Sequence, residues 1–271
     1  MSTIAVTGSA SGIGAAVAEH LAKAGHRVIG VDLRDADVTA DLGTAEGREY
    51  AVAEITRRCD GRLDGFLPFA GVAAATGRSG GLLVSVNYFG AITLLEGLRP
   101  ALRASGAASV VLISSNSTTT QPNWPVELAE ACLAGQEQRG REIAETFGDL
   151  AAIQAYPATK AALAWYARTR SAEYIKDGIR LNAIAPGLID TPMTQEGQQD
   201  ALIGEAMKGF LGAVPIGRPG RPEEIAELAA FLLSEQAGFF VGSVIFCDGG
   251  IDAAFRGKDW PAVWKVGEQP A

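Results

Sequence analysis

Histidine is scarce in this sequence of 271 residues, which contains only His20 and His26. Both lie in the first predicted helix-and-turn region, away from every other candidate site, so the sequence builds neither a Ser/His/Asp triad nor a histidine-rich zinc site. Cysteine is scarce too: three occur, without metal-ligand spacing and in an odd number that does not suggest a disulfide framework, at Cys59, Cys132 and Cys247. We therefore expect no bound metal and a reducing, cytoplasmic location.

Positive charge is also in short supply. Lysine and arginine total 23 against 31 aspartates and glutamates, which gives a formal net charge of -8. A general binder of nucleic acid or of an anionic membrane would need a basic surface. No signal peptide is recognisable before the first apolar run, and no apolar run is expected to span a membrane. We expect small molecules and further copies of the chain as partners, and neither nucleic acid nor membrane.

What the chain does contain is a regular alternation of strand-like and helical patterns. Apolar residues make up 48% of the chain and charged residues 20%, and the length suits one large domain. The predicted strands are Thr3–Thr7, Val28–Asp32, Leu63–Phe69, Ser109–Ser114, Ile179–Ala185 and Ser243–Cys247. The predicted helices are Ile13–Ala24, Ala45–Cys59, Leu82–Arg103, Ile153–Ile175 and Pro222–Leu233. This order predicts an α/β fold, a single Rossmann-type domain with a doubly wound parallel sheet over residues 1–271.

A glycine-rich turn joins the first predicted strand to the first helix. It contains Gly8, Gly12 and Gly14 within the segment TGSASGIG. Residues without a Cβ atom let the backbone approach a pyrophosphate, whose charge the amides of the helix N-terminus then meet. A packing turn is the alternative, but the strand-turn-helix-strand setting favours a dinucleotide site.

Asp32 stands at the end of the second predicted strand. A carboxylate there accepts hydrogen bonds from the adenosine ribose hydroxyls and repels a 2′-phosphate. No basic residue lies between Gly8 and Gly14, although Arg34 is close to Asp32 in sequence. We therefore expect NAD rather than NADP as the cofactor.

Tyr156 and Lys160 are four residues apart on a predicted helix, so they share one face. A free phenol has a pKa near ~10, and an adjacent cation favours its ionised form. Tyr156 is therefore expected to exchange a proton with a substrate hydroxyl or carbonyl oxygen. Ser115, at the end of a predicted strand, would donate a hydrogen bond to the same oxygen. A surface pair and ordinary turn chemistry are the alternatives for these residues taken singly.

In order along the chain, these motifs resemble the classical short-chain dehydrogenase/reductase family over nearly the whole sequence. Further positions match its adenine-flanking pair, the end of its Asn-Asn-Ala-Gly strand motif, its helical Asn and its nicotinamide loop. These positions, with the turn and the active-site residues, are Thr7, Gly8, Gly12, Gly14, Asp41, Leu42, Ala70, Gly71, Asn87, Ser115, Tyr156, Lys160, Pro186, Gly187 and Thr191.

The resemblance implies a complete set of site residues. The catalytic residues are Asn87, Ser115, Tyr156 and Lys160; Lys160 also binds the nicotinamide ribose, and Asn87 anchors a water through which protons reach Lys160. The cofactor-binding residues are Gly8, Ser11, Gly12, Ile13, Gly14, Asp32, Leu33, Asp41, Leu42, Ala70, Gly71, Tyr156, Lys160, Pro186, Gly187, Ile189 and Thr191. The substrate residues are Ser115, Tyr156, Leu188, Met193 and Phe210. Independently of the resemblance, the glycine-rich and apolar segment after a strand end suits a mobile lid containing Leu188, Met193, Phe210 and Leu211, with ordinary core packing as the alternative.

The sequence departs from the family pattern in two places. Pro68 and Phe69 stand where the family has two Asn, so the bracing hydrogen bonds of those side chains must come from elsewhere. The stretch before Tyr156 is longer than usual. That insertion, together with Val84–Gly90 and Gly249–Ala253, is similar to the bacterial 3α-hydroxysteroid dehydrogenase/carbonyl reductase branch, and coniferyl-alcohol dehydrogenases lie near that branch.

The expected function is NAD-dependent hydride transfer between a secondary alcohol and a ketone on an apolar, steroid-like or cyclic substrate. An aromatic, coniferyl-type alcohol is the alternative substrate, and a reductive biosynthetic ketoreductase is a weaker one because Asp32 favours the oxidised NAD pool. Outside enzymes, an NAD-sensing binding protein remains a hypothesis. The complete set of Ser115, Tyr156, Lys160 and Asn87 argues against it.

The insertion, about residues 118–152, contains two helical patterns, Val126–Leu133 and Gln136–Phe147. Each presents a narrow apolar face through i, i+4 pairs, Leu128 with Cys132 and Ile143 with Phe147. The tail, about residues 253–271, carries Phe255, Trp260 and Trp264 and is either a disordered end or an arm that packs on something.

The insertion also bears on assembly as a homodimer or homotetramer. Subunits of the family commonly pair through the helices that carry the Asn and the Tyr-x-x-x-Lys motif. We expect the insertion to cover that surface within its own subunit. Dimerisation would then use the Pro222–Leu233 helix and the Ser243–Cys247 edge strand. The alternative is an insertion that projects outward and itself contributes to the usual pairing.

Overall fold

A seven-stranded parallel sheet organises the chain in the computed structural model, which describes residues 1–260. The strands are β1 (Thr3–Thr7), β2 (Arg27–Asp32), β3 (Val38–Thr39), β4 (Gly65–Pro68), β5 (Ala108–Ile113), β6 (Ile179–Pro186) and β7 (Val244–Cys247). Their order is β3-β2-β1-β4-β5-β6-β7, so the winding direction reverses between β1 and β4. The predicted doubly wound α/β domain is confirmed. The two-residue β3 is too short to give a sequence pattern.

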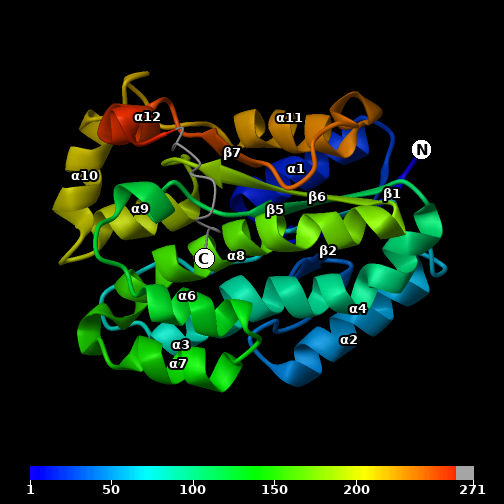
Figure 1. Cartoon of the computed structure of the whole chain (residues 1–271), viewed down its shortest axis with the longest axis horizontal. Coiled ribbons are helices and arrows are strands. Elements are labelled where there is room, and N and C mark those ends of the chain that lie inside the picture. The colour runs from blue at the N-terminus through cyan, green and yellow to red at the C-terminus, as the bar shows by residue number, and fades with distance from the viewer. Residues whose placement is uncertain (261–271) are drawn as a thin grey trace, which may run out of the picture.

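Helices cover both faces of the sheet (Figure 1). α1 (Gly12–Lys23) and α11 (Pro222–Leu233) lie on one face, and α2 (Ala45–Arg58), α4 (Gly90–Ser105) and α8 (Ala151–Tyr174) on the other. Strand β1 serves both layers, because its side chains alternate between faces. Ile4 and Val6 join the core under α1 and α11, whereas Ala5 joins the core under the other three helices. The hydrophobic cores on the two faces of the sheet thus hold in place the strand ends at which the site lies.

The helix predicted over Leu82–Arg103 is interrupted. It consists of α3 (Gly80–Leu83), a π-helical turn η1 (Val84–Phe89) and α4, and the N–H of Gly90 donates to the carbonyl of Ser85, five residues earlier. A π turn has no sequence periodicity of its own that would separate it from an α-helix. Such turns occur often at functional sites, and this one carries Asn87.

The same segment corrects one expectation about apolar runs. Gly80–Ser105 is, within residues 1–260, long and apolar enough by length and composition to cross a membrane, although no such run was expected. In the fold, 67% of its apolar window is buried. Leu94, Leu95 and Leu98 have no exposed surface in the core beside the sheet, so packing inside the protein accounts for their apolar character.

The insertion is helical, as predicted. After the short α5 (Ser117–Thr120) come α6 (Val126–Leu133) and α7 (Glu137–Glu145). α6 packs on α8, and α7 packs on α3, η1 and α6. Leu128, Cys132 and Ile143 are buried, whereas Phe147 is partly buried and lies beyond α7, which ends earlier than predicted at Glu145.

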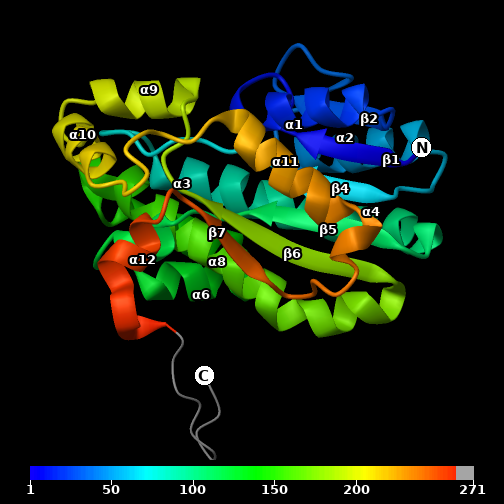
Figure 2. The same cartoon turned by 90° about the horizontal axis from the view of Figure 1, so that it is seen from above.

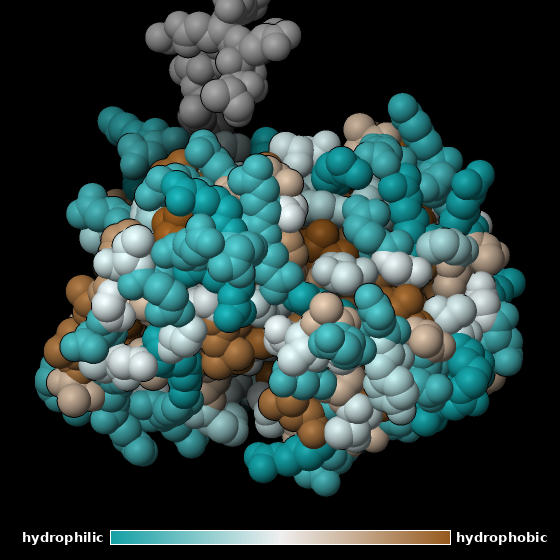
Figure 3. Space-filling view, turned by 90° about the horizontal axis from the view of Figure 1, so that it is seen from below, coloured by the Kyte–Doolittle hydropathy of each residue, from teal (hydrophilic) through white to brown (hydrophobic). Residues whose placement is uncertain are grey.

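The insertion therefore covers the first part of α8 and the segment before α4 within its own subunit. Trp124 of the insertion reaches the second half of α8 as well, where its ring lies 5.9 Å from the ring of Trp165. The end of α8 and the turn after it are held by Arg99 of α4, which forms ion pairs with Glu173 and Asp177 at 2.7 Å each. Figure 3 shows the face over α7 and α2, where hydrophilic side chains predominate and hydrophobic ones form small groups. The outer side of the insertion is thus mainly polar.

Besides α5, the short helices α9 (Pro192–Gln199), α10 (Gly204–Gly212) and α12 (Ile251–Arg256) were not predicted. α9 and α10 occupy the stretch expected to be a lid, and α12 begins what was expected to be an irregular tail. All three lie near one end of the molecule (Figures 1 and 2). Thr191 caps α9 by accepting a hydrogen bond from Thr194 N–H. The rest of the tail prediction, including Trp264, lies outside the described residues.

Candidate active site

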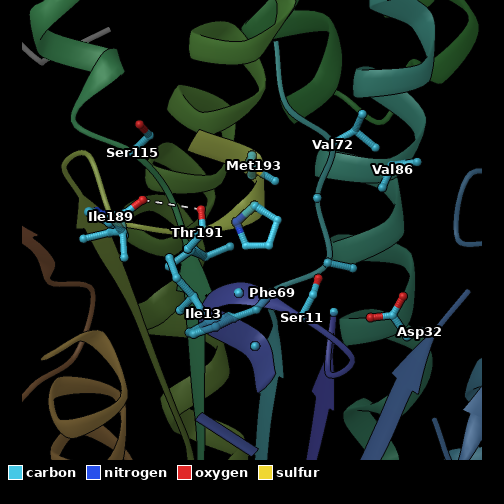
Figure 4. A pocket seen from close by; sticks show the side chains of 18 of the residues that line it. Ser11, Ile13, Asp32, Phe69, Val72, Val86, Ser115, Ile189, Thr191 and Met193 are labelled. Atoms are coloured by element: carbon cyan, nitrogen blue, oxygen red, sulfur yellow. Dashed lines mark hydrogen bonds between the residues drawn. The ribbon is translucent and has the colours of Figure 1, made fainter. Parts of the chain in front are cut away.

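A cleft opens at the carboxyl ends of the strands, at the point where the strand order reverses. All of the predicted cofactor-binding residues line it: Gly8, Ser11, Gly12, Ile13, Gly14, Asp32, Leu33, Asp41, Leu42, Ala70, Gly71, Tyr156, Lys160, Pro186, Gly187, Ile189 and Thr191. In Figure 4, Asp32 lies at one end of the cleft and Ser115 at the other. The segments after six strands of the sheet, β1 to β6, thus form one continuous surface.

The glycine-rich turn holds β1 and α1 closer together than other residues would allow. A Cβ atom on Gly14 would lie 2.1 Å from the carbonyl oxygen of Gly8, and Gly12 has a φ of +57°. Ser11 stands at the N-cap of α1 in an extended conformation and makes no side-chain capping hydrogen bond. The first amides of α1 therefore lie uncapped at the cleft, which fits the pyrophosphate of a dinucleotide.

Asp32 is positioned by the turn itself. Its Oδ2 accepts a hydrogen bond from Ala10 N–H at 3.0 Å, and its Oδ1 accepts one from Leu33 N–H at 2.7 Å. The carboxylate therefore faces the cleft from the end of β2. Arg34 is exposed and does not line the cleft. Asp32 thus stands where the adenosine ribose of a nicotinamide dinucleotide would lie.

Ser115, Tyr156 and Lys160 meet at the other end of the cleft. Ser115 is the second residue after β5, and Tyr156 and Lys160 come from one face of α8. Ser114 links the end of β5 to α8, since its hydroxyl donates a hydrogen bond to the carbonyl of Lys160 at 2.8 Å. Ser115 Oγ accepts a hydrogen bond from Ser117 N–H at 3.1 Å, so its own hydrogen can be donated to the Tyr156 oxygen or to a substrate oxygen beside it.

The ionisation of Tyr156 differs from the sequence-based expectation. Burial raises the pKa of Tyr156, and the hydrogen bond with Ser115 lowers it by a smaller amount. Lys160 does not reverse this, because its Nζ donates to the carbonyl of Ile113 at 3.0 Å and lies 5.7 Å from the centre of the Tyr156 ring. Burial also lowers the pKa of Lys160, to about 8. The expected gain in phenolate is thus not a property of the cofactor-free site.

Asn87 lies behind the cleft and is not among the residues that line it. Its side-chain amide pairs with Val72: Oδ1 accepts from Val72 N–H at 2.7 Å, and Nδ2 donates to Val72 O at 3.1 Å. The position of a Cβ atom on Gly71 would be 3.3 Å from Asn87 Oδ1 and 3.8 Å from Lys160 Nζ. The backbone of Gly71 therefore lies between the side chains of Asn87 and Lys160, and no other residue needs to separate them.

The bracing that the family takes from two Asn is supplied in part by Thr7. Its hydroxyl oxygen accepts a hydrogen bond from Ala70 N–H at 2.9 Å, which joins the end of β1 to the chain after β4. Phe69, the second substituted position, lines the cleft. The substitution thus leaves the wall of the cleft more apolar.

Of the three predicted substrate residues that belong to the expected lid, only Met193 lines the cleft. Leu188 does not, because its neighbour Ile189 faces the cleft while the Leu188 carbonyl accepts from Gly220 N–H. Phe210 stacks edge-on against Phe255 of α12 at 5.8 Å, so α10 turns it away from the cleft. Leu188 and Phe210 thus lie outside the lining of this cleft, and their assignment as substrate residues stays a prediction. The strand and helix ends supply lining residues that were not predicted: Ala40, Phe69, Val72, Leu82, Val86, Ile113, Ser114, Pro192 and Thr194.

Comparisons with known proteins agree with this geometry. The short chain dehydrogenase family model matches residues 2–126, and the Enoyl-(Acyl carrier protein) reductase family model matches residues 142–252. The 3-alpha-hydroxysteroid dehydrogenase/carbonyl reductase of Comamonas testosteroni is 42% identical over 94% of this chain and 98% of its own. The cis-4-hydroxycyclohexanecarboxylate dehydrogenase of Sinomonas cyclohexanicum is 31% identical over 92% of this chain and 95% of its own.

A solved structure is similar over almost the whole length. The crystal structure of the 3-alpha-hydroxysteroid dehydrogenase from Pseudomonas sp. B-0831 complexed with NADH has a TM-score of 0.89 and 46% identity, and the match covers 95% of this chain and 99% of that one. Fold and site together define an oxidoreductase that uses a nicotinamide cofactor to interconvert alcohols and ketones. The chain belongs to the short-chain dehydrogenase/reductase family, which confirms the resemblance seen in the sequence.

Proposed function

We propose that this enzyme uses NAD to interconvert a secondary alcohol and a ketone on an apolar cyclic substrate, with a 3α-hydroxysteroid as the best representative. The observation that carries the proposal is the convergence of Ser115, Tyr156 and Lys160 at one end of a cleft built for a dinucleotide. The charged residues that line the cleft, within the described part of the chain, are Lys160 there and Asp32 and Asp41 elsewhere. The substrate end thus suits an uncharged, apolar molecule.

In the proposed mechanism Tyr156 moves the proton. During reduction the phenol donates its proton to the oxygen of the developing alkoxide, and during oxidation the phenolate accepts the hydroxyl proton. Ser115 donates a hydrogen bond to the same oxygen and keeps it beside Tyr156. A bound nicotinamide supplies the hydride acceptor or donor. Lys160 would hold the nicotinamide ribose near Tyr156, and Asn87 would anchor a water that connects Lys160 to solvent.

The substrate class is tested with a panel of alcohols: androsterone, coniferyl alcohol and menthol, each with NAD and with NADP. The steroid is expected to give the highest kcat/KM with NAD, in keeping with the names of the relatives from Comamonas testosteroni and Pseudomonas. A higher value with coniferyl alcohol would favour the aromatic-alcohol alternative. Activity with none of the alcohols, and with none of the corresponding carbonyl compounds, would overturn the proposal.

The preference for NAD is assigned to Asp32. We expect the double variant Asp32→Ala, Leu33→Arg to shift the ratio of kcat/KM for NADP over NAD by at least about tenfold, because a repelling carboxylate is exchanged for a cation. Leu33 is 65% exposed, so an arginine fits there without disturbing the core. Steady-state kinetics with both cofactors measure the ratio. A wild-type enzyme that already prefers NADP would contradict the role of Asp32.

We propose that assembly uses α11 and β7, which lie on the side shown in Figure 2. β7 is the edge strand, and the exposed aromatic side chains nearby are Phe231 (40%), Phe239 (102%) and Phe246 (36%). An uncovered edge strand and apolar side chains are both stabilised by a two-fold partner. A homodimer through this surface remains compatible with further association to a tetramer. A cytoplasmic location stays a prediction from the cysteine pattern.

Phe231→Asp is therefore expected to convert the assembly to monomers, because a carboxylate would be buried in the proposed contact. Ile175→Asp at the end of α8 is the matched control, since Ile175 is 41% exposed on the surface of the alternative pairing. Light scattering coupled to gel filtration gives the mass of each variant. Dissociation of the Ile175 variant with retention of the Phe231 assembly would show that the helices bearing Asn87 and Tyr156 pair instead.

A further inference from the structure

Helix α7 of the insertion is fastened to the segment that carries Asn87. Within the described residues, the polar side chains of α7 that contact other elements bind Arg48 or residues 79–85. Glu137 pairs with Arg48; Arg141 donates to the carbonyl of Gly81 at 3.3 Å; and Glu145 accepts hydrogen bonds from Ser79 and from Gly81 N–H. Glycines permit this close approach: a Cβ atom on Gly140 would lie 3.2 Å from Val84.

Ser85 is the point at which these contacts converge. Its hydroxyl oxygen accepts a hydrogen bond from Arg141 Nη1 at 2.6 Å, and its carbonyl accepts one from Arg48 Nη1 at 3.3 Å. The same carbonyl accepts the π-type hydrogen bond from Gly90 N–H. The guanidinium groups of Arg48 and Arg141 thus bind Ser85, whose carbonyl accepts the i+5 hydrogen bond of the π turn. Ser85 is 1% exposed, so water cannot replace either contact.

The Arg48 contact depends on the insertion as well. Arg48 is 5% exposed, and its guanidinium makes two hydrogen bonds with the carboxylate of Glu137, at 3.1 and 2.8 Å. A buried cation requires such a partner. Glu137, at the start of α7, therefore holds the Arg48 guanidinium where it donates to the Ser85 carbonyl. Both hydrogen bonds to Ser85 thus depend on α7. Arg141 of α7 donates one directly, and Glu137 of α7 holds Arg48, which donates the other.

The consequence for the active site follows from the spacing. Asn87 is two residues after Ser85 and within the same π turn, and its amide is held by Val72 at hydrogen-bond distance on both sides. A change in the π turn would move Asn87 relative to Val72, Gly71 and thus Lys160. We infer that α7 positions Asn87 through Ser85, with Arg141 and Glu137 as positioning residues. The inference rests on the proposed function, because it assumes that Asn87 serves the reaction.

The variant that tests the inference is Arg141→Met, which removes the hydrogen bond to Ser85 and keeps an unbranched side chain. We expect kcat to fall by about tenfold, since small displacements of positioned groups cost that order of rate. The KM for NAD is expected to stay within about twofold, because Arg141 lies outside the cleft. The alkaline limb of the pH profile of kcat is expected to shift, since Asn87 would no longer hold the proton path to Lys160. Hydrogen exchange of residues 84–90 is expected to accelerate.

Two companion variants and one control sharpen the result. Arg141→Lys keeps a donor and is expected to recover at least about half of the lost rate, and Ser85→Ala is expected to reproduce the Arg141→Met effect. The double variant of Ser85→Ala with Arg141→Met is expected to lose no more than the worse single variant. Arg139→Met removes an exposed arginine from the same helix and is expected to behave as wild type.

The outcomes separate the inference from the function on which it rests. Turnover of Arg141→Met within about twofold of Arg139→Met would overturn the inference, and so would faster exchange spread equally through α8 and β5, since general loosening would then explain the loss. If Arg141→Met does not fold, Ser85→Ala decides in its place by the same readouts. An Asn87→Ala variant with wild-type turnover would show that the proposed role of Asn87 is wrong, and the inference would fall with it. Loss in Asn87→Ala without loss in Arg141→Met would overturn the inference alone.

Discussion

Replacing Tyr156 by phenylalanine is expected to lower turnover by at least about a hundredfold, the order typical of losing a general acid-base group, while NADH binding stays nearly intact. The reason is that the phenol hydroxyl alone can exchange a proton with the substrate oxygen beside Ser115. The ring itself contributes the cleft wall and remains in the variant. Single-turnover rates and NADH fluorescence titration measure the two effects separately.

The pH dependence of the wild-type enzyme gives the same residue a second readout. Burial raises the pKa of Tyr156, so the free protein at neutral pH carries the phenol, which is the form that donates a proton during reduction. Oxidation needs the phenolate and is expected to become faster as pH rises, whereas reduction becomes slower. Both trends are expected to vanish in Tyr156→Phe.

Tyr166→Phe is the matched control for this variant. It removes a buried phenol hydroxyl from the same helix, one that contacts Glu96 and Tyr174 and does not line the cleft. We expect Tyr166→Phe to alter stability without altering the pH profile. Tyr156→Phe turnover above about a third of wild type would show that another group moves the proton.

The fold was predictable because the dominant physical signals are local. The strands are short β-branched runs between helical patterns, and a parallel sheet with two cores needs little more than that alternation. The cofactor cleft was predictable for a related reason. In a doubly wound sheet, residues that follow the strands meet at one edge, so the turns after β1, β2, β4 and β6 had to face one another.

What the sequence did not reveal depends on contacts between distant segments. The π turn at Asn87 is held by Val72, Arg48 and Arg141, and none of these contacts leaves a local pattern. The places of Leu188 and Phe210 outside the cleft lining were not foreseen, because the sequence does not give the side-chain direction in the loop after β6 or in α10. The sequence led us to expect a lowered pKa for Tyr156, whereas burial raises it. The spacing of Tyr156 and Lys160 shows that they are neighbours but does not show how deeply Tyr156 is buried.

Lys160→Met is expected to change activity and stability in opposite directions. Turnover should fall by about a hundredfold or more, because in the proposed mechanism Lys160 would order the ribose and the proton path beside Tyr156. Stability should rise, because burial of the ammonium lowers the pKa of Lys160 from its ordinary 10.5 to about 8. A shift of this size corresponds to about 3 kcal/mol at neutral pH, from which the lost hydrogen bond to the Ile113 carbonyl removes about 1 kcal/mol. The net expected gain is about 2 kcal/mol.

The gain has a defined pH window. Below about pH 8 both the folded and the unfolded wild-type chain hold the proton, so the folded state bears the full cost of a buried charge. Between about 8 and 10.5 the unfolded chain binds more protons than the folded one, so wild-type stability rises with pH. The advantage of Lys160→Met is therefore present below pH 8 and lost as pH approaches 10.5.

Urea unfolding of the cofactor-free protein at pH 7 and pH 10 measures this difference. Lys176→Met serves as the control because Lys176 is exposed, and its replacement should leave stability near wild type at both pH values. Equal stability of the Lys160 variant and wild type at pH 7, or a gain that persists at pH 10, would show that the buried ammonium does not lower the free energy of unfolding. The expected result would instead mean that Lys160 is kept for the reaction at a cost to the fold, since a methionine of similar length packs in the same place without that charge.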